Sequence, residues 1–227
     1  MSNYNGVIND LIKGEWTNPE DQKKYGIPIK KIEIGKTLDG LEKDLIKSLH
    51  LDQKLLIVSD PFTHNAMGSR IFKNIKGKVN VDEYIWENPS SSIEGVEHLR
   101  EKIKDYDAMI AVGSGTVSDS IKYATFLEKK TYSVFATTPM NAYTTGTASI
   151  SFNGVKKSLV AHYAQGVFFD LEVLSNCPKR LTAATFADVI CRTTAQVDWL
   201  MSHKLLETNY QSTPYSLLSL YEGDMIQ

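Results

Sequence analysis

Short apolar runs alternate with amphipathic stretches over roughly the first two thirds of the chain. Residues 54–59 (KLLIVS) and 108–112 (AMIAV) are nearly continuous apolar runs, which is typical of strands buried on both faces of a sheet. Residues 93–106 instead place apolar side chains on one helical face. The same reading predicts strands at residues 31–34, 54–59, 79–86, 108–112 and 132–136. It predicts helices at residues 40–49, 63–75, 93–106 and 116–127.

The pattern changes near Asp170. Residues 180–206 carry no strand signal and predict one long helix or two consecutive helices. Another helix is expected to follow, with Thr213 as its N-cap and Pro214 in its first turn. The alternation before this point predicts an α/β fold with a doubly wound parallel sheet, followed by the start of an all-α domain. The predicted domains are residues 1–170 and residues 171–227.

Composition and charge narrow the class of protein. The chain has 227 residues, 42% of them hydrophobic, and a net charge of −2. A nucleic-acid or anionic-membrane partner would require a clustered basic excess, so neither partner is expected. The two cysteines do not form a CxxC pair, and the N-terminus lacks the basic start and apolar run of a signal peptide. We therefore expect a cytoplasmic protein without a transmembrane helix.

The strongest local signal is the glycine turn that follows the predicted strand at residues 108–112. Gly113, Ser114 and Gly115 lie between this strand and a predicted helix. Such a turn lets backbone N–H groups approach an anion, and the helix N-terminus adds a partial positive charge. A pyrophosphate group is the natural ligand, and a tight turn without a ligand is the alternative. The turn is neither a Walker motif nor a full GxGxxG fingerprint.

Polar residues also follow two other predicted strands. Asp60 comes directly after residues 54–59, at the sheet edge where ligands bind in open α/β folds. Its carboxylate can accept hydrogen bonds from ribose hydroxyls, and an Asx turn before Pro61 is the alternative. Thr137 and Thr138 likewise end a predicted strand and offer two hydroxyls at the same edge.

Asp188 is the most informative carboxylate of the later part of the chain. It lies within the otherwise apolar stretch at residues 183–190 (AATFADVI). An acid in such a stretch tends to be paired or bound to a metal. A salt bridge to Arg192, four residues on, is the alternative. None of the five histidines shows HxxxH spacing.

Four segments of the sequence carry a family resemblance. They occur in register at residues 111–125 (AVGSGTVSDSIKYAT), 137–150 (TTPMNAYTTGTASI), 168–199 (FFDLEVLSNCPKRLTAATFADVICRTTAQVDW) and 199–210 (WLMSHKLLETNY). Together they resemble the superfamily of glycerol dehydrogenase, iron-containing alcohol dehydrogenase and dehydroquinate synthase. Within this superfamily the sequence is most similar to the sn-glycerol-1-phosphate dehydrogenases.

The resemblance implies a Rossmann-like N-terminal domain that binds NAD or NADP. It also implies a C-terminal helical domain that binds a divalent metal, which is zinc, nickel or iron, with the substrate in the cleft between the domains. By this likeness the pyrophosphate is surrounded by the turn residues Gly113, Ser114, Gly115, Thr116, Val117 and Asp119. Asp60 faces the adenosine ribose. The nicotinamide side is lined by Thr137, Thr138, Thr145 and Thr147. Asp188 matches the metal-binding aspartate of the family.

The sequence departs from the family pattern at several positions. Asn141, the candidate catalytic position beside the substrate, stands where the family usually has an aspartate, and an amide cannot act as a base. Ala187 replaces a common glycine, and Arg192 stands where lysine is frequent. The two metal-binding histidines of the family lie beyond Gln227, so we expect a C-terminally truncated member. One aspartate cannot hold a catalytic zinc, which normally needs three protein ligands.

The resulting hypothesis is an NAD(P)-dependent, metal-assisted dehydrogenase of a polyol phosphate. The expected substrate pair is sn-glycerol 1-phosphate and dihydroxyacetone phosphate, as in phospholipid metabolism, and the expected assembly is a homo-oligomer. Two alternatives stay open. One is a non-catalytic or split-enzyme dinucleotide-binding fragment. The other is a lyase similar to dehydroquinate synthase, which uses the same cofactor and metal transiently.

Overall fold

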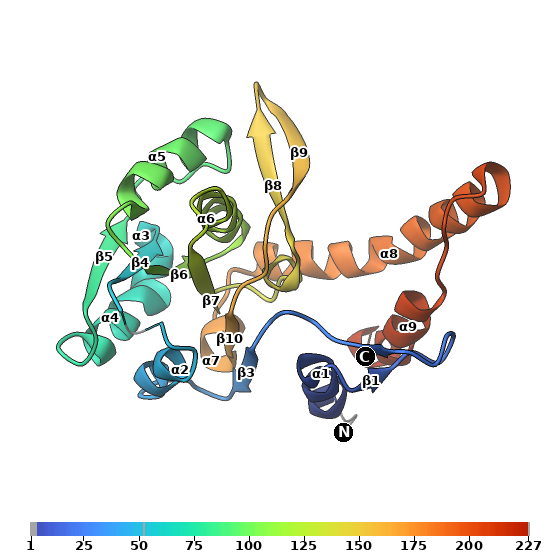
Figure 1. Ribbon diagram of the computed structural model, residues 1–227, viewed down its shortest axis with the longest axis horizontal. Coiled ribbons are helices and arrows are strands. Elements are labelled where there is room, and N and C mark those ends of the chain that lie inside the picture. The colour runs from blue at the N-terminus through green and yellow to red at the C-terminus, as the bar shows by residue number, and fades with distance from the viewer. Residues whose placement is uncertain (1–3, 52, 227) are drawn as a thin grey trace. The chain divides into compact units, whose positions relative to one another are not determined.

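The computed structural model describes residues 4–51 and 53–226 and contains a parallel sheet with helices on both faces (Figure 1). The six strands of this sheet are β3 (Lys31–Gly35), β4 (Leu55–Ser59), β5 (Val81–Ile85), β6 (Ala108–Gly113), β7 (Thr131–Ala136) and β10 (Gly166–Asp170). Their order across the sheet is β3-β10-β7-β6-β4-β5, and every neighbouring pair is parallel. The predicted α/β fold class is confirmed, and each of the five predicted strands is present.

Helices cover the two faces of the sheet in pairs. The first pair is α2 (Glu42–Ser48) and α4 (Ser69–Ile75), and the second is α5 (Ile93–Ile103) and α6 (Gly115–Leu127) (Figure 1). Alternate residues of each strand face the same helices, because side chains alternate between the faces of a sheet. Leu55 and Ile57 of β4 thus share one core cluster with Leu45 of α2 and Ile71 of α4. Burial on both faces explains the nearly continuous apolar runs.

The connection after β4 is one continuous helical stretch with a local irregularity. It consists of α3 (Pro61–Thr63), the π-helical turn η1 (His64–Gly68) and α4. The sequence pattern predicts one regular helix over residues 63–75. The π-helical turn is the difference, and such turns are frequent at functional sites.

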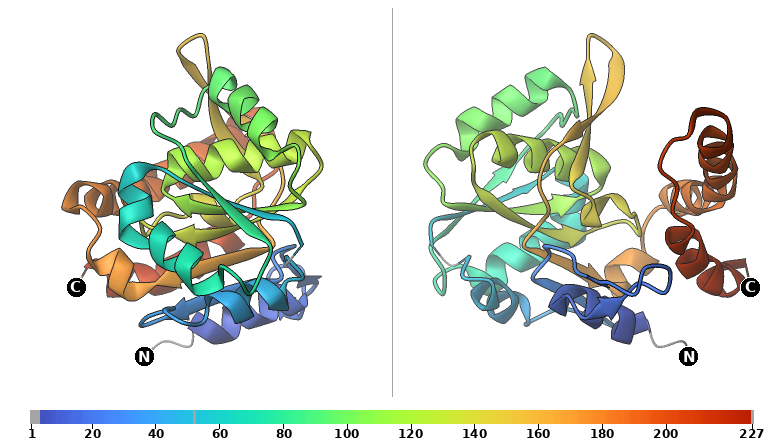
Figure 2. Two further views of the ribbon diagram at one scale, coloured as in Figure 1. Left: turned by 90° about the vertical axis from the view of Figure 1, so that its left-hand side faces the viewer. Right: turned by 45° about the vertical axis from the view of Figure 1, so that its right-hand side comes forward.

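A hairpin that the apolar pattern does not predict lies between β7 and β10. Its strands are β8 (Thr147–Phe152) and β9 (Val155–Val160), and the 3-10 turn η2 (Ala142–Thr144) precedes it. Asn153 and Gly154 form the hairpin turn with φ angles of 49° and 80°. The hairpin projects from the body of this part of the chain in each ribbon view (Figures 1 and 2).

The chain divides into two compact units. The sheet unit comprises Pro28–Thr182, and the helical unit comprises Met1–Ile27 together with Ala183–Gln227. The sheet unit also contains α7 (Leu171–Ser175) and the start of α8 (Lys179–Leu206). The predicted domain boundary between residues 170 and 171 stays a prediction.

The helical unit joins both ends of the described chain. It contains α1 (Tyr4–Lys13), the short pair β1 (Trp16–Thr17) and β2 (Lys24–Tyr25), most of α8, and α9 (Thr213–Ile226). Residues 180–206 therefore form one helix rather than two. Thr213 is the first residue of α9 and not its N-cap, and its hydroxyl donates a hydrogen bond to Asn18 Oδ1 at 2.8 Å.

Candidate functional site

A cavity of about 490 Å³ opens within the sheet unit at the carboxyl ends of four strands. From β4 the chain passes outward to β5 and then returns to β6 on the other side of β4. The strand order therefore reverses between β4 and β6, and ligands of open α/β folds bind outside such a reversal. The walls are formed by Phe62, Thr63, Ala66, Arg70, Ser114, Thr137, Thr138, Glu172, Val173, Asn176, Cys177, Pro178 and Leu181.

The glycine turn brings the start of α6 to this cavity. A Cβ atom on Gly113 would lie 2.8 Å from Val117 Cβ, so the close approach of strand and helix requires glycine there. Ser114 is the N-cap residue, but its side chain makes no capping hydrogen bond and lines the cavity. The first N–H groups of a helix have no partner within the helix. An anion beside Ser114 would therefore meet free donors and the positive end of the helix dipole.

The other predicted pyrophosphate residues differ in their surroundings. Thr116 is half-buried in the first turn of α6, whereas Val117 is fully buried beneath Gly113. The carboxylate of Asp119 accepts hydrogen bonds from Ser149 N at 3.1 Å and from Lys122 Nζ at 3.4 Å. Asp119 therefore joins α6 to the start of the hairpin. A contact between each of these residues and a pyrophosphate stays a prediction.

Thr137 and Thr138 follow β7 and form the adjoining wall. The hydroxyl of Thr137 is buried, and among the buried side-chain groups of the described residues it is the one without a hydrogen-bond partner. Thr138 Oγ1 instead lies 2.8 Å from the hydroxyl of Tyr143 in η2. A buried hydroxyl without a partner costs free energy, so Thr137 marks a place where a ligand group would add a hydrogen bond.

The remaining predicted threonines surround a buried lysine. Lys122 Nζ donates to Thr145 Oγ1 at 3.2 Å, to Thr147 O at 2.9 Å and to Ala142 O at 2.7 Å. Burial lowers the pKa of Lys122, and the nearby carboxylate of Asp119 opposes this shift. Thr145 and Thr147 are thus fixed against α6, and neither contributes to the wall of the cavity. Their predicted place on the nicotinamide side stays a prediction.

Asp60 caps the helix that follows β4. Its Oδ1 atom accepts hydrogen bonds from Phe62 N at 2.8 Å and Thr63 N at 2.9 Å, and Thr63 Oγ1 accepts from Asp60 N at 3.0 Å. This reciprocal capping box is a turn of the kind expected as the alternative to a ribose contact. The same turn presents Phe62 at the rim of the cavity with 86% of the residue exposed. A contact between Asp60 and a ribose stays a prediction.

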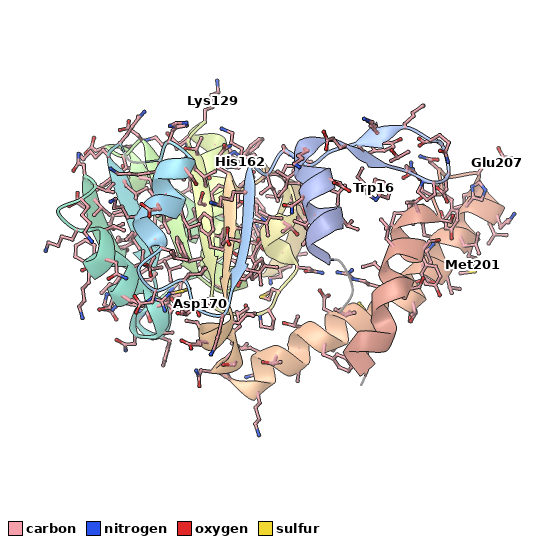
Figure 3. All side chains as sticks on the ribbon, turned by 90° about the horizontal axis from the view of Figure 1, so that it is seen from below. Trp16, Lys129, His162, Asp170, Met201 and Glu207 are labelled. Carbon is pink, nitrogen blue, oxygen red and sulfur yellow. The ribbon has the colours of Figure 1, made fainter. Side chains whose placement is uncertain are left out.

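Arg70 connects the cavity wall to two fully buried carboxylates. Its Nε atom donates to Glu42 Oε1 at 3.0 Å, and its Nη2 atom donates to Asp170 Oδ2 at 2.7 Å. Asp170 lies at the carboxyl end of β10 and also caps α7 (Figure 3). Burial alone would raise the pKa of Asp170, but hydrogen bonds from Leu38 N–H and Arg70 outweigh burial and lower it. The positive charge of Arg70 is therefore paired with these two carboxylates of the protein.

Comparison with known proteins places this architecture in a family. Residues 33–178, which contain the whole cavity wall except Leu181, match the model of a family described as iron-containing alcohol dehydrogenase. The chain belongs to the iron-containing alcohol dehydrogenase family. The predicted superfamily is thereby confirmed.

Curated relatives carry a narrower name. The glycerol-1-phosphate dehydrogenase [NAD(P)+] of Pyrococcus abyssi is 33% identical over 196 residues, which cover 85% of this chain and 56% of the relative. The protein of the same name from Methanobrevibacter smithii is 31% identical over 188 residues, which cover 81% of this chain and 52% of the relative. The chain thus spans about half the length of the curated relatives that it matches.

Solved structures share the fold. Glycerol dehydrogenase from Schizosaccharomyces pombe aligns with a TM-score of 0.63 and 18% identity over 72% of this chain and 42% of its own. An iron-containing alcohol dehydrogenase from Thermotoga maritima aligns with a TM-score of 0.63 and 16% identity over 73% of this chain and 52% of its own. Within residues 4–51 and 53–226, no helix has both the length and the apolar character needed to cross a membrane.

Neither Asn141 nor Asp188, the predicted substrate and metal residues, is among the residues that line the cavity. Asn141 is exposed at the start of η2, where its carbonyl accepts from Thr144 Oγ1 at 3.1 Å. Asp188 is an exposed residue of α8 in the helical unit. Among the described residues, no group of three or more His, Cys, Asp and Glu side chains is arranged to hold a metal ion. The roles of Asn141 and Asp188 stay predictions.

Several residues of the site were not found by the sequence reasoning. Lys122, Tyr143 and Arg70 connect the segments around the cavity, and Cys177 lines it. A lysine inside the apolar helix at residues 116–127 is a signal that could have identified Lys122, because a buried cation needs partners.

Proposed function

We propose that this chain carries the dinucleotide-binding part of an NAD(P)-dependent, metal-assisted dehydrogenase of a polyol phosphate. The proposed substrate pair is sn-glycerol 1-phosphate and dihydroxyacetone phosphate. The observation that supports the proposal most is the cavity at the reversal of the strand order, bordered by the glycine turn before α6. Membership in the iron-containing alcohol dehydrogenase family and the name shared by the curated relatives support the substrate class.

The residues around the cavity fit a dinucleotide chemically. In this proposal the free N–H groups at the start of α6 bind the pyrophosphate, and Ser114 contributes its hydroxyl. Thr137 supplies a buried hydroxyl without a protein partner among the described residues. A bound nicotinamide would accept or donate the hydride, and the protein would orient it against the substrate. A cavity of about 490 Å³ lies within the usual range for a ligand site.

The metal part of the proposal rests on family membership alone. By resemblance to the family, Asp188 would supply one ligand, but a catalytic zinc normally needs three protein ligands. The described residues provide no such group and do not by themselves fit the metal. We therefore assign no step through a metal.

The decisive experiment measures dinucleotide binding to the chain of residues 1–227. Calorimetric titration with NADH and with NADPH is expected to give saturable binding, and the stronger ligand identifies the cofactor. Gly115→Val is expected to abolish binding, because its side chain would press on Met140 and narrow access to the first turn of α6. Gly154→Asn is the control, because Gly154 lies in the hairpin turn with φ of 80° and nothing near its Cβ position. Absence of binding at millimolar concentrations of both dinucleotides would falsify the proposal.

A further inference from the structure

A buried tyrosine hydroxyl lies between the two segments that border the cavity. Tyr143 is fully buried in η2, and its hydroxyl donates a hydrogen bond to Gly113 O at 2.9 Å. The same hydroxyl lies 2.8 Å from Thr138 Oγ1. One side chain therefore connects the end of β6, where the glycine turn begins, with the polar residues that follow β7.

The number of protons fixes the direction of these hydrogen bonds. The tyrosine hydroxyl has one hydrogen, and the carbonyl of Gly113 can only accept it. The hydroxyl of Thr138 must therefore donate to the tyrosine oxygen. Burial raises the pKa of Tyr143 to about 12, so the tyrosine keeps its proton at physiological pH. Thr138 consequently retains only acceptor capacity for any further partner.

The turn that carries Tyr143 is itself held by hydrogen bonds from Lys122. Lys122 of α6 donates to the carbonyl of Ala142, which precedes Tyr143, and to Thr145 and Thr147, which follow it. These contacts bring η2 against α6, the helix that starts at the glycine turn. Tyr143 therefore does not sit on a free loop, and its hydroxyl is held at a defined place between Gly113 and Thr138.

We propose that Tyr143 is a positioning residue for dinucleotide binding. Its hydroxyl keeps the glycine turn and Thr138 in one hydrogen-bonded unit. This inference rests on the proposed function. Gly113 precedes the anion-binding N–H groups, whereas Thr138 offers a lone pair on the neighbouring wall. The wall at Thr138 therefore suits a ligand group with a hydrogen to donate, such as a ribose hydroxyl or an amide, and not a phosphate oxygen.

The test compares NADH affinities of matched variants of the full chain by calorimetry. Tyr143→Phe removes only the hydroxyl and is expected to weaken binding by about tenfold, since two hydrogen bonds are lost. Thr138→Val is expected to weaken binding as well, whereas Thr138→Ser keeps the hydroxyl and should bind like the wild type. Tyr132→Phe is the control. Tyr132 is also fully buried, and its hydroxyl lies 3.5 Å from His162 O, away from the cavity wall.

A double-variant cycle separates positioning from a general loss of stability. Tyr143→Phe and Thr138→Val break the same hydrogen bond, so the affinity loss of their combination is expected to be smaller than the product of the two single losses. Independent effects would instead multiply. Circular dichroism melts of every variant accompany the titrations. If Tyr143→Phe does not fold, the comparison of Thr138→Val with Thr138→Ser decides the proposal.

The possible outcomes distinguish this inference from the proposed function. If the wild type binds NADH and Tyr143→Phe binds it equally well, the inference is wrong and the proposed function stands. Multiplying effects in the double variant, or equal binding by Thr138→Val and Thr138→Ser, also overturn the inference. If the wild type binds neither NADH nor NADPH, the proposed function fails and this inference fails with it.

Discussion

Arg70 forms ion pairs with both Glu42 and Asp170, and neither carboxylate is exposed to solvent. The three residues come from α4, α2 and the end of β10. A buried ion pair adds little net stability when complete, but the loss of one partner leaves an uncompensated charge in the interior. Substitution of the arginine is therefore expected to be the most destabilising change in this cluster, because it leaves two buried carboxylates without a cation.

Arg70→Met is expected to destabilise the chain by about 3–5 kcal/mol, because both carboxylates lose their cation. Urea unfolding followed by circular dichroism measures this change. Arg100→Met is the matched control, since Arg100 pairs with the more exposed carboxylates of Glu97 and Glu128. That substitution should cost at most about 1 kcal/mol. Equal losses in the two variants would contradict the importance assigned to burial.

Asp170 gives a prediction for pH. Its pKa in the folded chain lies below the ordinary value of 3.8, because hydrogen bonds from Leu38 N–H and Arg70 outweigh burial. A lowered folded pKa contributes stability above the unfolded value, and this contribution is lost as the pH falls through the folded pKa. Wild-type stability should therefore fall as the pH drops below 3.8. Asp170→Asn, measured by the same unfolding assay, should be less stable at pH 6 and should lose less between pH 5 and pH 3.

Single residues differ in how far the sequence could predict them. The glycine turn and the two threonines were predictable because each directly follows an apolar strand, and parallel strands bring their carboxyl ends to one edge. The ion pair of Arg70 and Asp170 was not predictable, because 100 positions separate the two residues in the sequence. Asp60 shows the limit of reading one residue at a time, since the same carboxylate fits a helix cap and a ribose contact.

At the scale of elements, the buried strands were predicted well and the exposed hairpin was missed. Strands β8 and β9 lack a continuous apolar run, and β9 is largely exposed. The Asn153–Gly154 pair was nevertheless a usable signal, because both residues adopt the positive φ angles of a tight hairpin turn. Strand β10 was also missed, although residues 166–169 (GVFF) are mostly apolar and buried.

Helix α7 provides a test of ligand access. Cys177 follows this helix, is half-buried and lines the cavity, whereas Cys191 is exposed on α8. A bound dinucleotide is expected to slow alkylation of Cys177 several-fold and to leave the rate at Cys191 unchanged. Mass spectrometry of iodoacetamide-treated chain, with and without NADH, measures both rates in one sample. Equal protection of both cysteines would point to a global change and not to occupancy of the cavity.

At the scale of the whole molecule, the proposed activity depends on a bound metal as well as on a dinucleotide. A metal that stabilises the developing oxyanion accounts for several kcal/mol of the barrier, and each 1.4 kcal/mol or so is about tenfold in rate. The proposed function gives this metal one ligand, Asp188, and the described residues hold no group of three or more His, Cys, Asp and Glu side chains arranged for a metal ion. In the same proposal Asn141 stands beside the substrate, where an amide cannot act as a base.

If Asp188 is the single protein ligand of the metal, as proposed, residues 1–227 should reduce dihydroxyacetone phosphate negligibly with NADH or NADPH, even with added zinc, nickel or iron, because a catalytic metal normally needs three protein ligands. The loss of nicotinamide absorbance measures the rate. The Pyrococcus abyssi relative, assayed with the same reagents, is the positive control. Steady turnover on the order of 1 per second or faster would contradict this expectation and require another metal site or a metal-free mechanism.

The strand order also determines when the sheet can be completed during synthesis. Among the described strands, β3, the first of the six to leave the ribosome, pairs with β10, the last, and with no other, in the register Lys31 to Gly166 through Gly35 to Asp170. At the usual rates of translation, β3 must wait on the order of 10 s for its neighbour. During that interval its backbone hydrogen-bonding groups are unpaired, and an unpaired strand is open to association with other chains. The nascent chain therefore carries an unpaired β3 until residues 166–170 emerge.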